Sequence, residues 1–230
     1  TQAVIEILDI ITPSAQILVT FLCDVLGARI VRFDSERAKK NTTSAAAPSR
    51  VSDATLFLFF DAVLARMEPA EAMQVWPVVI VFVKDFVANS MARKLHVYPV
   101  MRIFTALGEK ICVTAAIEDR RTKRELQDNF VKLIDSCILI AGRSFDQSTW
   151  IRRAGRDIIE EFDREAGEFA SELLSLEDEK RAEIDVSAAG NGFIDALNYF
   201  LAARGLPALR KIQMDADRIQ AIVALSLIHI

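Results

Sequence analysis

The chain has 230 residues, 52% of them hydrophobic, with only 8 Gly and 6 Pro and a net charge of −4. This composition suits one or two domains with a large buried core, and the scarcity of turn residues favours helices joined by short connections. The longest uninterrupted apolar run, residues 75–83, has nine residues. A membrane-spanning helix needs about 20, so the sequence predicts no such helix.

The N-terminal stretch and the cysteines bear on the compartment. Acidic residues and Pro13 interrupt the first apolar stretch, and no basic segment precedes it, so we expect no secretory signal. Cys23, Cys112 and Cys137 lack a CxxC spacing and fall within helical apolar patterns. We therefore expect reduced core cysteines and a cytosolic protein.

The first elements in the chain alternate between helix and loop. Residues 2–11 are expected to be the end of a helix, and Pro13 suits the first turn of a second helix that runs to about Val31. Asp24 should face outward from that helix. The apolar stripe that should face the core consists of Ile17, Leu18, Phe21, Leu22, Val25 and Leu26. Residues 34–50 show no apolar periodicity and predict a mobile loop.

Two very apolar helices should follow this loop. Ser52 or Asp53 can cap the first, whose apolar core spans residues 56–64 and should be buried on two sides. Glu68 and Pro69 mark the start of the second, and Pro77 should restart or kink it. It is expected to be an inner helix.

Tyr98 and Pro99 should open an amphipathic helix. Its apolar stripe consists of Val100, Ile103, Phe104, Leu107 and Ile111. Arg102, Glu109 and Lys110 lie off the stripe, so we expect them to be solvated. A charged joint at residues 117–125 leads into another helix, which Gly142 should end.

The C-terminal third should contain a basic connection at residues 143–156, a long acidic helix to about Leu176 and a second loop at residues 183–192. Asn191 can cap the next helix, and Pro207 should start the last one. Residues 226–230 (SLIHI) resemble translated cloning sequence and are expected to be a non-native tail. Residues 1–225 are then one helical fragment of a longer chain.

The predicted fold class is all-α. Paired antiparallel helices with short joints favour an irregular α-solenoid of the HEAT or armadillo type. No strict repeat period is visible. A non-repeating helical bundle is therefore the alternative.

The sequence contains few signs of a catalytic or ligand-binding site. There is no GxSxG, HExxH, GxxxxGK[ST] or GxGxxG motif. His96 is expected to be an ordinary surface histidine, and the alternating charges of residues 118–128 should form local ion pairs. A pI of 5.4 argues against nucleic-acid binding. We therefore expect no enzyme, no catalytic, cofactor-binding or metal-binding residue, and no cofactor.

Charge is divided between two segments. Residues 84–156 carry 14 Lys or Arg against 8 Asp or Glu, a balance of +6, whereas residues 157–185 carry 3 against 12, a balance of −9. The least neutralised cations surround Phe145 and Trp150. Basic residues beside aromatic ones can meet an anionic membrane or an acidic partner. The alternative is that Trp150 packs into the next helix and the arginines are solvated. The candidate contact residues are Arg143, Trp150, Arg152, Arg153 and Arg156.

Two blocks of the sequence resemble the C-terminal region of the Dopey family. The first block consists of VWP (75–77), KDFVAN (84–89), Pro99, ALGEK (106–110), ED (118–119), REL (124–126), Asp128 and FVKL (130–133). The second consists of NYFLA (198–202), LPAL (206–209), KI (211–212) and DADRI (215–219). The resemblance covers roughly residues 50–225.

This resemblance implies a non-catalytic scaffold in endosome-to-Golgi trafficking, cytoplasmic and peripheral on Golgi and endosomal membranes. The implied partners are a large Arf-exchange-factor-like scaffold of the Mon family, phosphoinositide membranes and kinesin light chain. The alternative function is an armadillo-type or HEAT-type adaptor that binds peptides in a groove, in nuclear transport or as a general scaffold. Regularly spaced Asn and Trp on its inner helices would favour that alternative.

Overall fold

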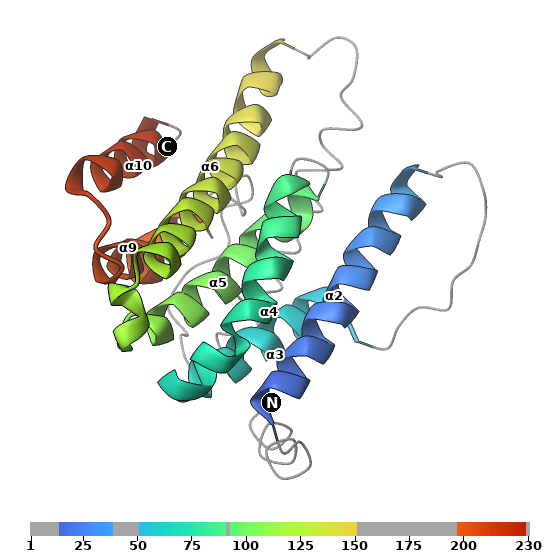
Figure 1. Ribbon diagram of the computed structural model, residues 1–230. Helices are drawn as coiled ribbons and strands as arrows, with labels where there is room; N and C mark the ends of the chain where they lie inside the picture. Colours follow the sequence, from blue (N-terminus) through green and yellow to red (C-terminus); the bar gives the residue numbers. More distant parts are fainter. Residues whose placement is uncertain (1–13, 39–50, 91–92, 151–196, 229–230) are drawn as a thin grey trace, which may run out of the picture.

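The computed structural model describes residues 14–38, 51–90, 93–150 and 197–228. All regular structure in these ranges is helical, which confirms the all-α class (Figure 1). The elements are α2 (Ala15–Ala38), α3 (Asp53–Arg66), α4 (Pro69–Ala88), η1 (Lys94–His96), α5 (Val97–Ile111), η2 (Ala115–Glu118), α6 (Arg120–Trp150), η4 (Leu201–Gly205), α9 (Leu206–Lys211) and α10 (Ala216–Ile228). No helix in these ranges combines the length and apolar composition needed to cross a bilayer.

The main helices lie in two layers (Figure 1). Helices α2, α4 and α6 lie side by side in one layer, and α3, α5 and α9 lie behind them. From α2 to α6 the chain passes from one layer to the other at each successive helix, as it does in stacked helix pairs. The helices of 24, 14, 20, 15 and 31 residues do not establish a repeating unit. The predicted solenoid arrangement stays a prediction.

Helix α5 lies at the centre of the fold. Thirteen of its 15 residues are buried, because α3, α4, α6 and α9 all contact it. Phe104 lies between the rings of Trp76 and Phe130, with centroid distances of 6.1 and 6.0 Å. Trp76 is therefore a core residue and cannot line a peptide-binding groove.

Several helix starts occur where the sequence predicts them. Ser52 caps α3, since its hydroxyl accepts a hydrogen bond from the Thr55 amide. Glu68 and Glu71 form a capping box at the start of α4, with Pro69 in the first turn. The expected restart at Pro77 does not occur, because α4 runs through this proline to Ala88.

Two predicted helix ends are wrong. Helix α2 continues to Ala38, so residues 34–38 are helical and not part of a loop. Helix α6 continues through Gly142 to Trp150, which makes residues 143–150 helical as well. A glycine inside a helix costs only about 1 kcal/mol relative to alanine, so it does not end a helix by itself.

The expected core face of α2 is also partly wrong. Ile17 and Phe21 are 58% and 62% exposed. The residues that α2 buries are Val19, Leu22, Cys23, Leu26 and Ile30. Asp24 is exposed, as predicted.

The C-terminal helices differ from the prediction at Pro207. Residues 197–211 form one helical run, in which the π-helical turn Leu201–Gly205 leads directly into α9. Pro207 therefore does not start a new helix. The break comes after Lys211, where Gln213 takes the left-handed conformation (φ 54°) and the Met214 amide donates to the Leu209 carbonyl.

Some predictions fall outside the described residues. They are the helix end at residues 2–11, the part of the loop at residues 39–50, the acidic helix at residues 157–176, the loop at residues 183–192 and the Asn191 cap. Residues 226–228 of the expected tail continue α10. The rest of that tail also lies outside the described residues.

Candidate functional site

The predicted basic contact segment is only partly within the described chain. Arg143 and Trp150 lie on the last turns of α6, although the structure does not describe their side chains. Arg152, Arg153 and Arg156 lie outside the described residues. Figure 1 shows that these last turns extend beyond the end of α4. Contact with a membrane or partner stays a prediction.

The most buried charge cluster surrounds Asp61 on α3. The Asp61 side chain is 10% exposed, and the Arg102 side chain from α5 is 3% exposed. Arg102 Nη2 lies 2.9 Å from Asp61 Oδ2, and Arg204 Nη1 lies 3.1 Å from the same oxygen. The expectation that Arg102 is solvated is wrong, because its guanidinium pairs with the Asp61 carboxylate in the interior, whereas the Arg204 side chain is 28% exposed.

The π-helical turn places Arg204 where it can reach two carboxylates. A π turn inserts one residue into the α-helical repeat and so changes the direction of the side chains that follow. Arg204 Nη2 lies 3.7 Å from Glu109 Oε2, and Lys211 Nζ lies 3.6 Å from Glu109 Oε1. The guanidinium of Arg204 also lies 5.9 Å from the Phe200 ring centroid. Residues 200–211 are thereby joined to α3 and α5 by charge.

A second cluster joins α2, α3 and η1. Asp53 Oδ1 accepts a hydrogen bond of 2.9 Å from Arg29, and Asp53 Oδ2 lies 3.6 Å from His96 Nε2. Arg29 also donates to the Val51 carbonyl. The predicted surface position of His96 is wrong, since this side chain is 3% exposed and its ring lies 5.9 Å from that of Phe57.

Hydrogen bonding lowers the pKa of the Asp53 carboxyl. The hydrogen bond with His96 is the largest influence, and together with Arg29 it holds the pKa of Asp53 below its ordinary value, against the opposing effect of burial. The carboxylate form is therefore favoured in the folded protein. The cluster holds the N-terminal ends of α3 and α5 together.

The described side chains support neither of two kinds of site, a metal site and a reactive thiol. No three His, Cys, Asp or Glu residues gather there to hold a metal ion. The three cysteines are thiols, and burial raises the pKa of Cys23 to about 12 and that of Cys112 to about 11. Burial raises the pKa of Cys137 as well. Cys23 and Cys137 are buried as predicted, whereas Cys112 is half-buried.

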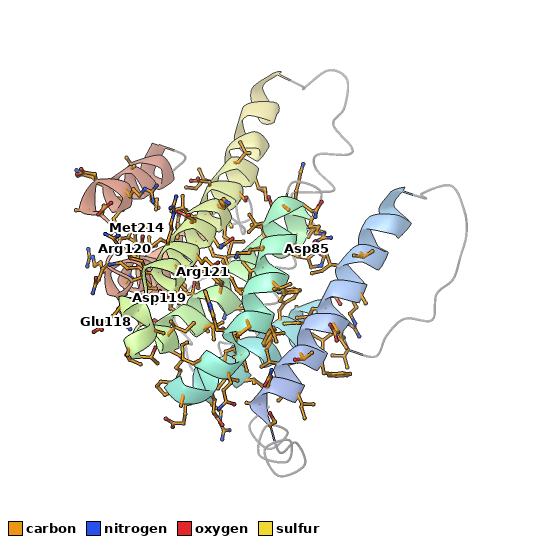
Figure 2. All side chains as sticks on the ribbon, viewed as in Figure 1. Asp85, Glu118, Asp119, Arg120, Arg121 and Met214 are labelled. Carbon is orange, nitrogen blue, oxygen red and sulfur yellow. The ribbon has the colours of Figure 1, made fainter. Side chains whose placement is uncertain are left out.

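The charged joint before α6 forms local ion pairs, as predicted. Figure 2 shows Glu118, Asp119, Arg120 and Arg121 gathered at the start of this helix. Asp119 accepts from the Thr122 amide, which lowers the pKa of the Asp119 carboxyl. Two ion pairs are local, Arg121–Glu125 at 3.4 Å and Arg124–Asp128 at 3.6 Å. Lys84 of α4 adds a long-range pair with Glu125 at 3.0 Å. Charges neutralised in this way do not form a basic stripe for nucleic acid.

The described residues form an all-helical fold in which the buried charges hold helices together. The family model DOP1 C-terminal matches residues 59–200, and the chain therefore belongs to the Dopey family. This match confirms the family resemblance. No solved structure matches the chain.

Family membership indicates a trafficking-related scaffold. The family and the all-helical fold of the described residues are consistent with a protein that is not an enzyme.

Asp61→Asn should destabilise the fold strongly, because it leaves Arg102 buried beside a neutral amide. We expect the free energy of unfolding to fall by about 3–5 kcal/mol in urea titrations followed by circular dichroism. Glu109→Gln is the control, since Glu109 is more exposed and its ion pairs are longer, and it should cost less than about 1 kcal/mol. Equal losses for the two variants would contradict the assigned importance of Asp61.

Asp53 should make stability depend on pH at the acidic end. Its pKa is lower in the folded protein than in the unfolded chain, so its contribution is complete above the unfolded value and is lost as pH falls through the folded value. The stability difference between the unmodified chain and Asp53→Asn should therefore be largest near neutral pH and shrink below about pH 4. Urea titrations at several pH values measure this difference.

The exposed Asp24 provides the control for the pH series. Asp24→Asn should leave the acid dependence unchanged. If Asp53→Asn has the same acid dependence as the unmodified chain, the His96 and Arg29 contacts do not favour the carboxylate.

Proposed function

We propose that this chain is part of a non-catalytic scaffold in endosome-to-Golgi trafficking. The observation that carries the proposal is the match of the Dopey C-terminal family model to residues 59–200. In the described part of the chain the most buried charges join helices to one another, so their role is structural. We place the protein in the cytoplasm, on the surface of Golgi and endosomal membranes.

The proposed protein partner is a large Arf-exchange-factor-like scaffold of the Mon family, with kinesin light chain as a further partner. An extended helical stack supports this assignment, because its long faces can bind a large partner over many residues. The alternation between two helix layers supports an irregular α-solenoid as the architecture of the stack. A peptide-binding adaptor is less well supported, because Trp76 is in the core.

The proposed membrane contact is the basic segment at residues 143–156. Arg143, Arg152, Arg153 and Arg156 are accompanied there by a single acid, Asp146. Each cation near an anionic leaflet contributes about 1 kcal/mol. The part of this segment that the structure describes is the end of α6, which extends past α4 (Figure 1), and this position supports the proposed contact with a flat surface.

Arg152→Glu combined with Arg153→Glu should weaken binding to vesicles of phosphatidylcholine and phosphatidylserine by at least about tenfold, as measured by flotation. The matched control is Arg121→Glu with Arg124→Glu, which makes the same charge change on side chains that are 85% and 84% exposed. The control should lose less binding. An unchanged affinity for the first variant would exclude the membrane assignment.

Capture from cytosol tests the partner. The 230-residue chain, immobilised as bait and read by mass spectrometry, should enrich the Mon-family scaffold. The control bait carries Phe104→Asp, which places a charge in the core and should abolish folding, as circular dichroism can verify. Equal recovery on both baits, or no recovery on the folded bait, would contradict the proposed partner.

A further inference from the structure

The helical run of residues 197–211 changes its hydrogen-bond register at the π-helical turn Leu201–Gly205. The Leu206 amide donates to the Leu201 carbonyl, one residue further back than in an α-helix. The turn therefore holds one residue more than an α-helical turn would hold. Single π turns inside α-helices are rare and frequently occur at functional positions.

Pro207, directly after the turn, disfavours the α-helical register. It has no N–H to donate, and in an α-helix its ring would clash with the carbonyl of Ala203, four residues earlier. A wider turn before the proline relieves this clash. The turn is closely packed on its inner side, since a Cβ at Gly205 would lie 3.0 Å from Leu201 Cδ2.

Arg204 favours the π-helical register through its ion pairs. From this turn it reaches Asp61 on α3 and Glu109 on α5, at 3.1 and 3.7 Å. Successive residues of an α-helix differ by about 100° in direction, so closing the turn to the α-helical register would rotate α9 by this angle against residues 197–200. Such a rotation would move the guanidinium of Arg204 away from these carboxylates.

Contacts on both sides of the turn hold the run in place. Before the turn, the Phe200 ring meets the Tyr98 ring of α5 edge-on, with 5.7 Å between the centroids. After the turn, Gln127 of α6 donates to the carbonyls of Ile212 and Gln213 at 3.0 and 3.2 Å. The extra residue allows these two sets of contacts and the ion pairs of the turn to exist together.

We propose that residues 201–207 are a conformational switch with a π-helical and an α-helical register. The π-helical register pairs Arg204 with Asp61, whereas the α-helical register releases Arg204 and leaves Asp61 with Arg102 alone. Pro207 and the pairing with Asp61 both favour the π-helical register. The switch connects the exposed side of α9 to the most buried charge cluster of the described chain.

This connection is a device for regulation. A partner that contacts the exposed Arg210 and Lys211 of α9 more closely in one register than in the other shifts the population toward that register. Its binding then changes the partners of Asp61 in the interior. The switch does not depend on the proposed trafficking function.

Deleting the extra residue tests the register. Removal of the exposed Ala203 turns the hydrogen bond between Leu206 and Leu201 into an α-helical one, while both sides of the turn keep their contacts. The folding equilibrium constant from urea titrations should therefore fall by less than about tenfold. The control is deletion of the exposed Ala28 inside α2, which should lower the constant more than about a hundredfold, because Ile30 leaves the core. Equal losses for the two deletions would overturn the proposal.

A double-mutant cycle tests the existence of the second register. Arg204→Leu should lower the folding equilibrium constant of the unmodified chain by about tenfold or more, because Asp61 loses a charged partner. Pro207→Ala restores an N–H at position 207 and so populates the α-helical register, in which Arg204 is already released. In the Pro207→Ala chain, Arg204→Leu should therefore cost severalfold less.

The matched control for the cycle is Pro69→Ala, at a proline in the first turn of α4. It should leave the cost of Arg204→Leu unchanged. If Arg204→Leu costs as much in the Pro207→Ala chain as in the unmodified chain, the two residues are not coupled and the switch does not exist.

Discussion

The packing of the helices depends on one buried carboxylate with two arginines. Asp61 lies on α3, Arg102 on the central helix α5 and Arg204 on the π-helical turn, so one side chain joins three elements. Moving charges from water to the interior is costly, and the cost is offset only when each charge keeps close partners. The apolar residues provide most of the driving force for burial, whereas this cluster fixes how the three elements meet.

The cluster also explains why the central helix is buried on nearly all sides. The sequence of α5 is amphipathic, and such a pattern predicts that its polar face lies at the surface. Arg102 instead turns toward Asp61, and the helical run that carries Arg204 covers the face that would otherwise meet water. Long-range pairing of charges thus overrides the local pattern.

The sequence predicts the helical class, most helix starts, the ion pairs before α6 and the family. These features depend on local signals, such as a capping box or a proline in a first turn, and on residues that match a family pattern. The burial of Arg102 and His96 depends on partners 41 and 43 residues away in the chain, which periodicity cannot locate. One signal was available: Asp61 and Arg102 are single charges within very apolar segments, and such charges are rarely buried without a partner of opposite sign.

The separation of Asp61 and Arg204 by 143 residues has a consequence for synthesis on the ribosome. The helices from α2 to α6 make their contacts with near neighbours in the sequence, so they can assemble while the chain is still emerging. At that stage Asp61 already has Arg102 as a partner, and its second arginine has not yet been translated. The Asp61 carboxylate therefore has a single arginine partner until Arg204 leaves the exit tunnel, and the outer side of α5 is covered only after the rest of its contacts with α3, α4 and α6 can form.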